Sequence, residues 1–326
     1  MLRTRKLFLA AVLAILSPFA TLPSIAQEAL GTQLALCIGD STERCLSAAI
    51  VVPTTSVVRG WMSPEVGTAW GSGYKGAGVT ITVIDDFKSS SRFKGDLGTG
   101  VLLQLHGEWT RMEASMIAPL ATIKSKDFST STAVTFYTGL DVLNLSYGMY
   151  ATSGYSVSQI RWSNQEKSII NAAGNGTAVI AKAAGNDAVA VNGTAGGKQD
   201  YLNLALIGKQ SAIFVGALNS NGTELSKATL AWYSNYAGTD TSVQSHFLVV
   251  GVEGDKTGLY GTSFAAPIVS GYAAILGSKF KTATPTQITN QLLNTARTDT
   301  LLNYSISTYG KGEASLTRAL APASIQ

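Results

Sequence analysis

Four side chains suited to chemistry stand at the predicted ends of secondary-structure elements. Asp85 closes a run rich in Val and Ile, and Asn186 follows a similar run. His106 opens a stretch with helical character, and Ser263 opens a helix rich in alanine. Polar groups at the carboxyl ends of buried strands lie where open α/β sheets bind ligands, and a serine nucleophile at a helix N-terminus gains from the positive field there. Taken singly, each residue also has a structural interpretation, as a strand-end cap, a structural histidine or an N-cap serine.

The surroundings of Ser263 and Asn186 make them stronger candidates than their types alone. Ser263 follows Gly261 and precedes Pro267, a residue well placed near a helix start. Small residues at positions 265, 266, 271, 273 and 274 indicate a helix that packs tightly in a core. The tetrapeptide Ala-Ala-Gly-Asn occurs twice. The copy that ends at Asn175 follows a helical pattern and is typical of a helix C-terminus, so the copy that ends at Asn186 is the candidate.

The elements that must position these side chains alternate between strands and helices. Short apolar runs that suit buried parallel strands lie at Val79–Ile84, Val142–Leu145, Ala178–Ala183, Ala212–Val215 and Phe247–Val252. Candidate helices lie at 106–117, 157–172, 263–280 and 285–297. Alternation of this kind predicts an α/β fold, a doubly wound parallel sheet with helices on both faces.

Composition excludes several classes of protein. The 326 residues are 45% hydrophobic and only 13% charged, against a usual charged share of about 25%, which excludes a disordered chain and a coiled coil. The formal charge of +4 falls to +1 without residues 1–26, so nothing points to nucleic acid or to an anionic membrane. Gly71, Gly73 and Gly76 match a dinucleotide-binding pattern, but they precede a predicted strand instead of following one, so no nucleotide is expected.

The N-terminus is predicted to be a secretory signal peptide. Arg3, Arg5 and Lys6 precede the apolar run Leu7–Leu16, and a small-residue cleavage site ends at Ala26. Ten apolar residues are too few for a helix to span a bilayer of about 30 Å, so a membrane anchor is the weaker interpretation. We expect an exported protein, secreted or periplasmic, with cell-surface association as an open alternative and with no membrane contact after residues 1–26 are removed. A monomer is expected.

Residues 27–60 are interpreted as an N-terminal extension that carries the two cysteines of the chain. Cys37 and Cys45 enclose a short loop, and an even number of cysteines in an oxidising compartment favours a disulfide. Two unpaired thiols are the alternative. No histidine lies nearby, so a metal site at these cysteines is not expected.

Together these patterns resemble the subtilisin-like serine peptidases. The order Asp85, His106, Ser263 is the order of that family, and residues 261–267 match its Gly-Thr-Ser-x-Ala-Ala-Pro motif throughout. Residues 142–148 resemble the edge strand that holds the substrate backbone. The resemblance covers residues 61–322 as one peptidase domain and leaves 323–326 as a tail. Within the family, the sequence pattern is most similar to that of secreted and autotransporter-type bacterial members.

The resemblance implies a secreted serine endopeptidase that cleaves polypeptides through an acyl-enzyme intermediate. It makes Ser263 the nucleophile, His106 the general base, Asp85 the group that orients His106, and Asn186 a donor to the oxyanion. It makes two segments substrate-binding: Ser146, Tyr147 and Gly148, which pair with the substrate backbone, and Ala183, Ala184 and Gly185, which line a pocket for apolar or medium-sized side chains. No cofactor and no metal are implied.

Departures from the family pattern keep two alternatives open. The first motif is Asp85-Asp86-Phe87 where the family usually has Asp-x-Gly, and the bulky residues Trp109, Arg111 and Met112 follow His106. A peptide-binding pseudopeptidase with the same fold is the first alternative. An unrelated exported α/β binding protein is the second.

Overall fold

The computed structural model describes residues 5–6 and 56–326. The rest of the predicted signal peptide, most of the extension, and Cys37 and Cys45 lie outside the described residues, so the predicted disulfide does too. Residues 57–326 belong to one compact unit. In the part of the chain that is described, no helix combines the length and the apolar character needed to cross a bilayer.

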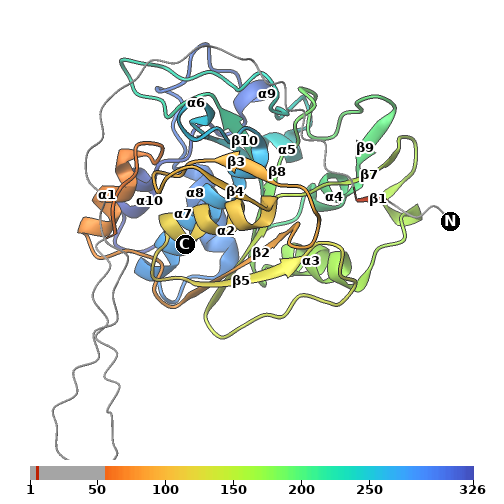
Figure 1. Ribbon diagram of the computed structural model, residues 1–326, viewed down its shortest axis with the longest axis horizontal. Helices are drawn as coiled ribbons and strands as arrows, with labels where there is room; N and C mark the ends of the chain where they lie inside the picture. The colour runs from red at the N-terminus through yellow and green to blue at the C-terminus, as the bar shows by residue number, and fades with distance from the viewer. Residues whose placement is uncertain (1–4, 7–55) are drawn as a thin grey trace, which may run out of the picture. The chain divides into compact units, whose positions relative to one another are not determined.

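A six-stranded parallel sheet forms the centre of this unit, with the strand order β11-β10-β8-β6-β2-β5 (Figure 1). Its strands are β2 (Val79–Asp85), β5 (Thr122–Asp127), β6 (Leu140–Leu145), β8 (Val179–Ala183), β10 (Ala212–Leu218) and β11 (Phe247–Gly251). Every residue of β2, β8, β10 and β11 is buried. Burial on both faces explains why these strands are mostly apolar, and the few polar side chains they carry, such as Thr80, Thr82 and Lys182, are buried too.

Helices cover both faces of the sheet. On one face, α2 (His106–Ile117), α7 (Ala266–Lys279) and α8 (Pro285–Asn294) pack against alternate strand residues such as Ile81 and Val83. On the other face, α3 (Asn164–Asn175) and α4 (Tyr201–Leu206) share a second core with residues such as Ile84 and Ile180. The predicted doubly wound α/β architecture is therefore confirmed.

Smaller elements surround the main sheet. One small antiparallel sheet pairs β3 (Phe93–Gly95) with β4 (Leu102–Gln104). In a second antiparallel sheet, β7 (Met149–Thr152) lies between β1 (Arg5–Lys6) and β9 (Lys198–Asp200). The remaining helices are α1 (Pro64–Gly71), α5 (Thr241–Ser245), α6 (Gly254–Thr257), α9 (Ile306–Tyr309) and α10 (Leu316–Leu320), with 3-10 turns η1 (Val157–Gln159) and η2 (Thr262–Phe264).

The structure contains the predicted strands and helices, but the predicted bounds of one helix are wrong. The prediction of a single helix over 157–172 is wrong, because η1 ends at Gln159 and α3 begins only at Asn164. Ser163 caps α3 by accepting a hydrogen bond from the Gln165 backbone, which fixes the later start. The helix ends where the repeated tetrapeptide predicted, at Asn175, because Gly176 takes a left-handed conformation.

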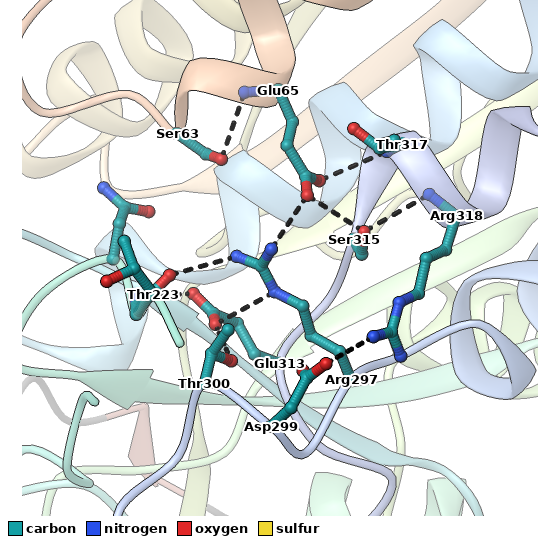
Figure 2. A network of polar contacts seen from close by, with 12 residues as sticks. Ser63, Glu65, Thr223, Arg297, Asp299, Thr300, Glu313, Ser315, Thr317 and Arg318 are labelled. Atoms are coloured by element: carbon teal, nitrogen blue, oxygen red, sulfur yellow. Dashed lines mark hydrogen bonds and ion pairs between the residues drawn. The ribbon is translucent and has the colours of Figure 1, made fainter. Parts of the chain in front are cut away.

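A buried network of charges joins α1 to the C-terminal segments of the chain. Arg297 donates to Glu65 at 3.0 Å and to Glu313 at 3.3 Å, and Figure 2 shows its guanidinium between the two carboxylates. Ser315 and the Thr317 backbone donate to the same Glu65 side chain. The network therefore connects residues more than 200 positions apart in the sequence.

We expect Arg297→Ala to lower the free energy of unfolding by about 3–5 kcal/mol, because it leaves two largely buried carboxylates without their cation. The matched control is Arg318→Ala, which removes a bridge to Asp299 between side chains that are 49% and 41% exposed. That pair should contribute at most about 1 kcal/mol. Urea unfolding of both variants provides the measurement, and equal losses would contradict the assignment.

Candidate active site

Asp85 and His106 form a buried hydrogen-bonded pair. Asp85 is the last residue of β2 and has no exposed surface, while His106 is the first residue of α2 and is 3% exposed. Nδ1 of His106 lies 2.7 Å from Oδ1 of Asp85. A carboxylate accepts the Nδ1 hydrogen, so this contact selects the imidazole tautomer in which Nε2 is the basic nitrogen.

Two further donors hold the Asp85 carboxylate in place. The backbone N–H of Asp86 donates to Oδ1 at 2.6 Å, and the hydroxyl of Thr110 donates to Oδ2 at 2.7 Å. Thr110 stands one turn after His106 on the same helix. Sequence reasoning did not identify Thr110, although its spacing of four residues from His106 was a usable signal, because residues four apart share one helix face.

Trp109, one of the bulky residues after His106, contributes to the packing around the imidazole ring. Trp109 is fully buried, and its indole N–H donates to the carbonyl of Phe93 at 2.8 Å. The Phe93 ring in turn meets the His106 ring edge-on, with 5.5 Å between centroids. Arg111 pairs with Glu108 on the outer side of α2, so neither Trp109 nor Arg111 intrudes on the Asp85–His106 contact.

Ser263 lies in the turn η2, directly before α7. Its hydroxyl donates to the Ser146 carbonyl at 3.3 Å, and the Ser146 hydroxyl donates to the Ser263 carbonyl at 2.8 Å. The neighbouring Phe264 ring lies 5.3 Å from the His106 ring, so the serine turn packs beside the histidine. Gly261 begins this turn with φ of 134°, a conformation that glycine adopts at little cost.

Asn144 and Ser270 extend these contacts inside the protein. The Asn144 amide donates to the Ser146 hydroxyl at 2.9 Å, and the Ser270 hydroxyl donates to the Asn144 carbonyl oxygen at 3.3 Å. Asn144 has no exposed surface, as its place in an apolar run predicted.

Thr262 orients the side chain of Asn186. Both the backbone N–H and the hydroxyl of Thr262 donate to Oδ1 of Asn186, at 2.8 and 2.9 Å. The same hydroxyl accepts from the Gly185 backbone at 3.0 Å. Because Oδ1 takes both of these donors, Nδ2 is the end of the amide that can donate to an incoming oxygen.

Asn235 holds the segment that carries Asn186 in place through hydrogen bonds. Its backbone donates to the Gly185 carbonyl and its amide donates to the Ala184 carbonyl, at 2.9 and 3.0 Å. Its side-chain oxygen accepts from the Asp187 and Val189 backbones. No sequence signal singled out Asn235, which lies about fifty residues further along the chain.

The two predicted substrate segments follow neighbouring strands. Residues 146–148 continue from β6, and residues 183–185 from the end of β8, which pairs directly with β6. The prediction that 142–148 form an edge strand is wrong, because β6 lies inside the sheet between β2 and β8. Residues 146–148 reach beyond the last paired residue, Leu145, so they extend past the carboxyl edge of the sheet.

The arrangement suits general-base activation of a hydroxyl, with a side-chain amide beside it. Within residues 56–326, no three His, Cys, Asp or Glu side chains are grouped as a metal site would require.

A family model described as the subtilase family matches residues 113–312. That range contains Asn186 and Ser263 but begins after Asp85 and His106. Mycosin-5 of Mycobacterium tuberculosis (strain ATCC 25618 / H37Rv) is 42% identical over 92 residues, which cover 26% of this chain and 16% of that relative. Among solved structures, the prenylagaramide maturation protease PagA is similar with a TM-score of 0.52 and 18% identity, over 79% of this chain and 98% of that one. That likeness supports the fold.

We expect Thr110→Val to slow the reaction of Ser263 with a fluorophosphonate by about 10–100-fold. The substitution keeps the side-chain shape but removes the donor to Oδ2 of Asp85, and a hydrogen bond to a charged group contributes about 1.5–3 kcal/mol. Thr110→Ser retains the hydroxyl and should react at nearly the unaltered rate. Labelling rates measured by gel fluorescence compare the three proteins, and equal rates for Val and Ser variants would refute a role for the hydroxyl.

Proposed function

Because this chain belongs to the subtilase family of serine-type endopeptidases, we propose that it hydrolyses peptide bonds through Asp85, His106 and Ser263. The observation that carries this proposal is the buried 2.7 Å contact between His106 and Asp85, with the Ser263 turn packed beside it through Phe264. The family model does not reach Asp85 or His106, so the roles of these two residues rest on geometry.

In the proposed reaction, Ser263 Oγ attacks the scissile carbonyl while His106 Nε2 takes the hydroxyl proton. His106 then gives that proton to the leaving amine, and water hydrolyses the acyl-enzyme by the same route. The Ser263 hydroxyl donates to the Ser146 carbonyl at 3.3 Å. In the reaction we expect it to donate to His106 Nε2, because catalytic hydrogen bonds often tighten only in the complex.

The developing negative charge would be stabilised by two donors. One is Nδ2 of Asn186, whose orientation Thr262 supports through two hydrogen bonds to Oδ1. The other is the backbone N–H of Ser263, close to the N-terminus of the 14-residue helix α7. Loss of one side-chain donor of this kind costs about 10²–10³ in turnover in serine proteases.

The substrate would bind as an extended segment against residues 146–148. Those residues lie beyond the paired part of β6, so their backbone can pair with an added strand. We further propose that the chain acts on polypeptides after export, on the basis of the signal-peptide pattern in residues 1–26.

A labelling experiment tests the proposal. The full chain is expressed in a host that exports it, and the secreted protein is incubated with a fluorophosphonate probe beside Ser263→Ala and a heat-denatured sample. We expect a label on the Ser263 peptide, mapped by mass spectrometry, and none in either control. Ser278, a buried serine near the end of α7, provides a control variant, Ser278→Ala, which should label normally.

Absence of label on protein with a cooperative unfolding transition would overturn the proposal. The pseudopeptidase alternative would then be favoured, and peptide-dependent stabilisation without hydrolysis would support it.

A further inference from the structure

The two substrate segments are no longer paired with each other where β6 and β8 stop pairing, and we refer to the space between them as the crevice. The last paired residues are Leu145 and Lys182. Beyond them the second segment continues along β10, since Ala184 donates to the Val215 carbonyl. In the proposed complex, the side chain before the scissile bond enters this crevice, because its backbone lies along 146–148 and its carbonyl lies at Asn186 and Ser263.

The Tyr150 side chain crosses that crevice from one wall to the other. Its ring packs on the Cα of Gly148, where an added methyl group would lie 3.0 Å from the ring Cζ and would collide with the ring edge. Its hydroxyl lies 3.5 Å from Oδ2 of Asp187, two residues beyond the other segment. A side chain that reaches from Gly148 to Asp187 occupies space that a large substrate side chain would need.

A buried ion pair lies next to the same ring. Lys182 is 1% exposed, and its ammonium group lies 2.6 Å from the Ala183 carbonyl and 3.2 Å from Oδ2 of Asp200. Oδ2 of Asp200 would lie 2.8 Å from a methyl group added at Gly148. The Met149 backbone donates to Oδ1 of the same carboxylate. A large apolar side chain that displaced the ring would therefore press against a buried ion pair, which is costly unless both charges stay satisfied.

We propose that Tyr150 closes this crevice and restricts cleavage to peptide bonds that follow a small residue, namely glycine, alanine or serine. The inference rests on the proposed function and narrows the expectation of a pocket for apolar or medium-sized side chains. Tyr150 is then a specificity-determining residue, since it acts on the choice of substrate side chain and not on the reacting atoms.

Asp187 raises one competing possibility, a preference for a basic side chain. Its carboxylate makes no ion pair with a lysine or arginine among residues 56–326. Partial burial, however, raises the pKa of Asp187 above its ordinary value, and the nearby Asp200 charge acts in the same direction. Access of a basic side chain to this carboxylate is limited by the Tyr150 hydroxyl, which lies 3.5 Å from Oδ2.

The test compares fluorogenic peptides that differ only in the residue before the cleaved bond: Gly, Ala, Ser, Leu, Phe or Lys. The ratio of kcat/KM between two peptides is independent of how much of a preparation is folded, so it separates specificity from stability. For the unaltered protein we expect the Ala peptide to exceed the Phe peptide by about tenfold or more, the scale on which pocket size discriminates substrates.

Two substitutions at Tyr150 separate the effect of its ring on substrate choice from the effect of its hydroxyl group. Tyr150→Ala removes it and should lower the Ala-to-Phe ratio by about tenfold or more. Tyr150→Phe keeps the ring but loses the hydroxyl contact with Asp187, so it should retain the preference for small residues. Tyr150→Val serves as a second variant if Tyr150→Ala does not fold.

Faster cleavage of the Phe, Leu or Lys peptide by the unaltered protein would overturn the inference, as would a ratio that neither Tyr150→Ala nor Tyr150→Val changes. Either result leaves the proposed function standing, because hydrolysis would have been observed. Failure to cleave every peptide, together with absence of a fluorophosphonate label at Ser263, would overturn the proposed function and this inference with it.

Discussion

The pair of reciprocal hydrogen bonds between Ser146 and Ser263 is the constraint on which the candidate site depends. Each serine hydroxyl donates to the backbone carbonyl of the other, across 117 positions of sequence. The contact ties the end of a central strand to the turn that begins α7, so one interaction places both the proposed nucleophile and the segment proposed to hold its substrate. Asn144 supports it from within the core, where an amide without partners would be costly.

Among residues 56–326, some buried charged groups have partners of opposite charge and others do not. Lys182 and Asp200 form an ion pair, with 3.2 Å between Nζ and Oδ2. Glu113, on the same helix as His106, is fully buried, and neither of its carboxyl oxygens has a hydrogen-bond partner. Burial raises the pKa of Glu113 well above its ordinary value, so the neutral acid is favoured. The helix thus carries His106 and Glu113 without adding the charge of a Glu113 carboxylate to the core.

Much of the fold followed from local patterns, and the failures have local causes. The apolar runs predicted the strands because a strand buried on both faces needs no polar residues. The single helix predicted over 157–172 was wrong because Ser163 starts a new helix, and a serine cap competes with helix continuation. The edge-strand prediction was wrong because strand order is a property of the whole sheet, in which β6 lies between β2 and β8.

The sequence by itself determined which residues are available for chemistry: an aspartate ending a strand, a histidine and a serine opening helices, and an asparagine after a second strand. Those signals are local, because strand ends and helix starts are set by neighbouring residues. Only the tertiary structure decided what stands around them. Thr110 reaches Asp85, Asn235 fastens the Asn186 segment, and Tyr150 crosses the crevice. Each of these contacts joins residues at least 25 positions apart in the sequence, and the packing of the whole fold decides which distant residues meet.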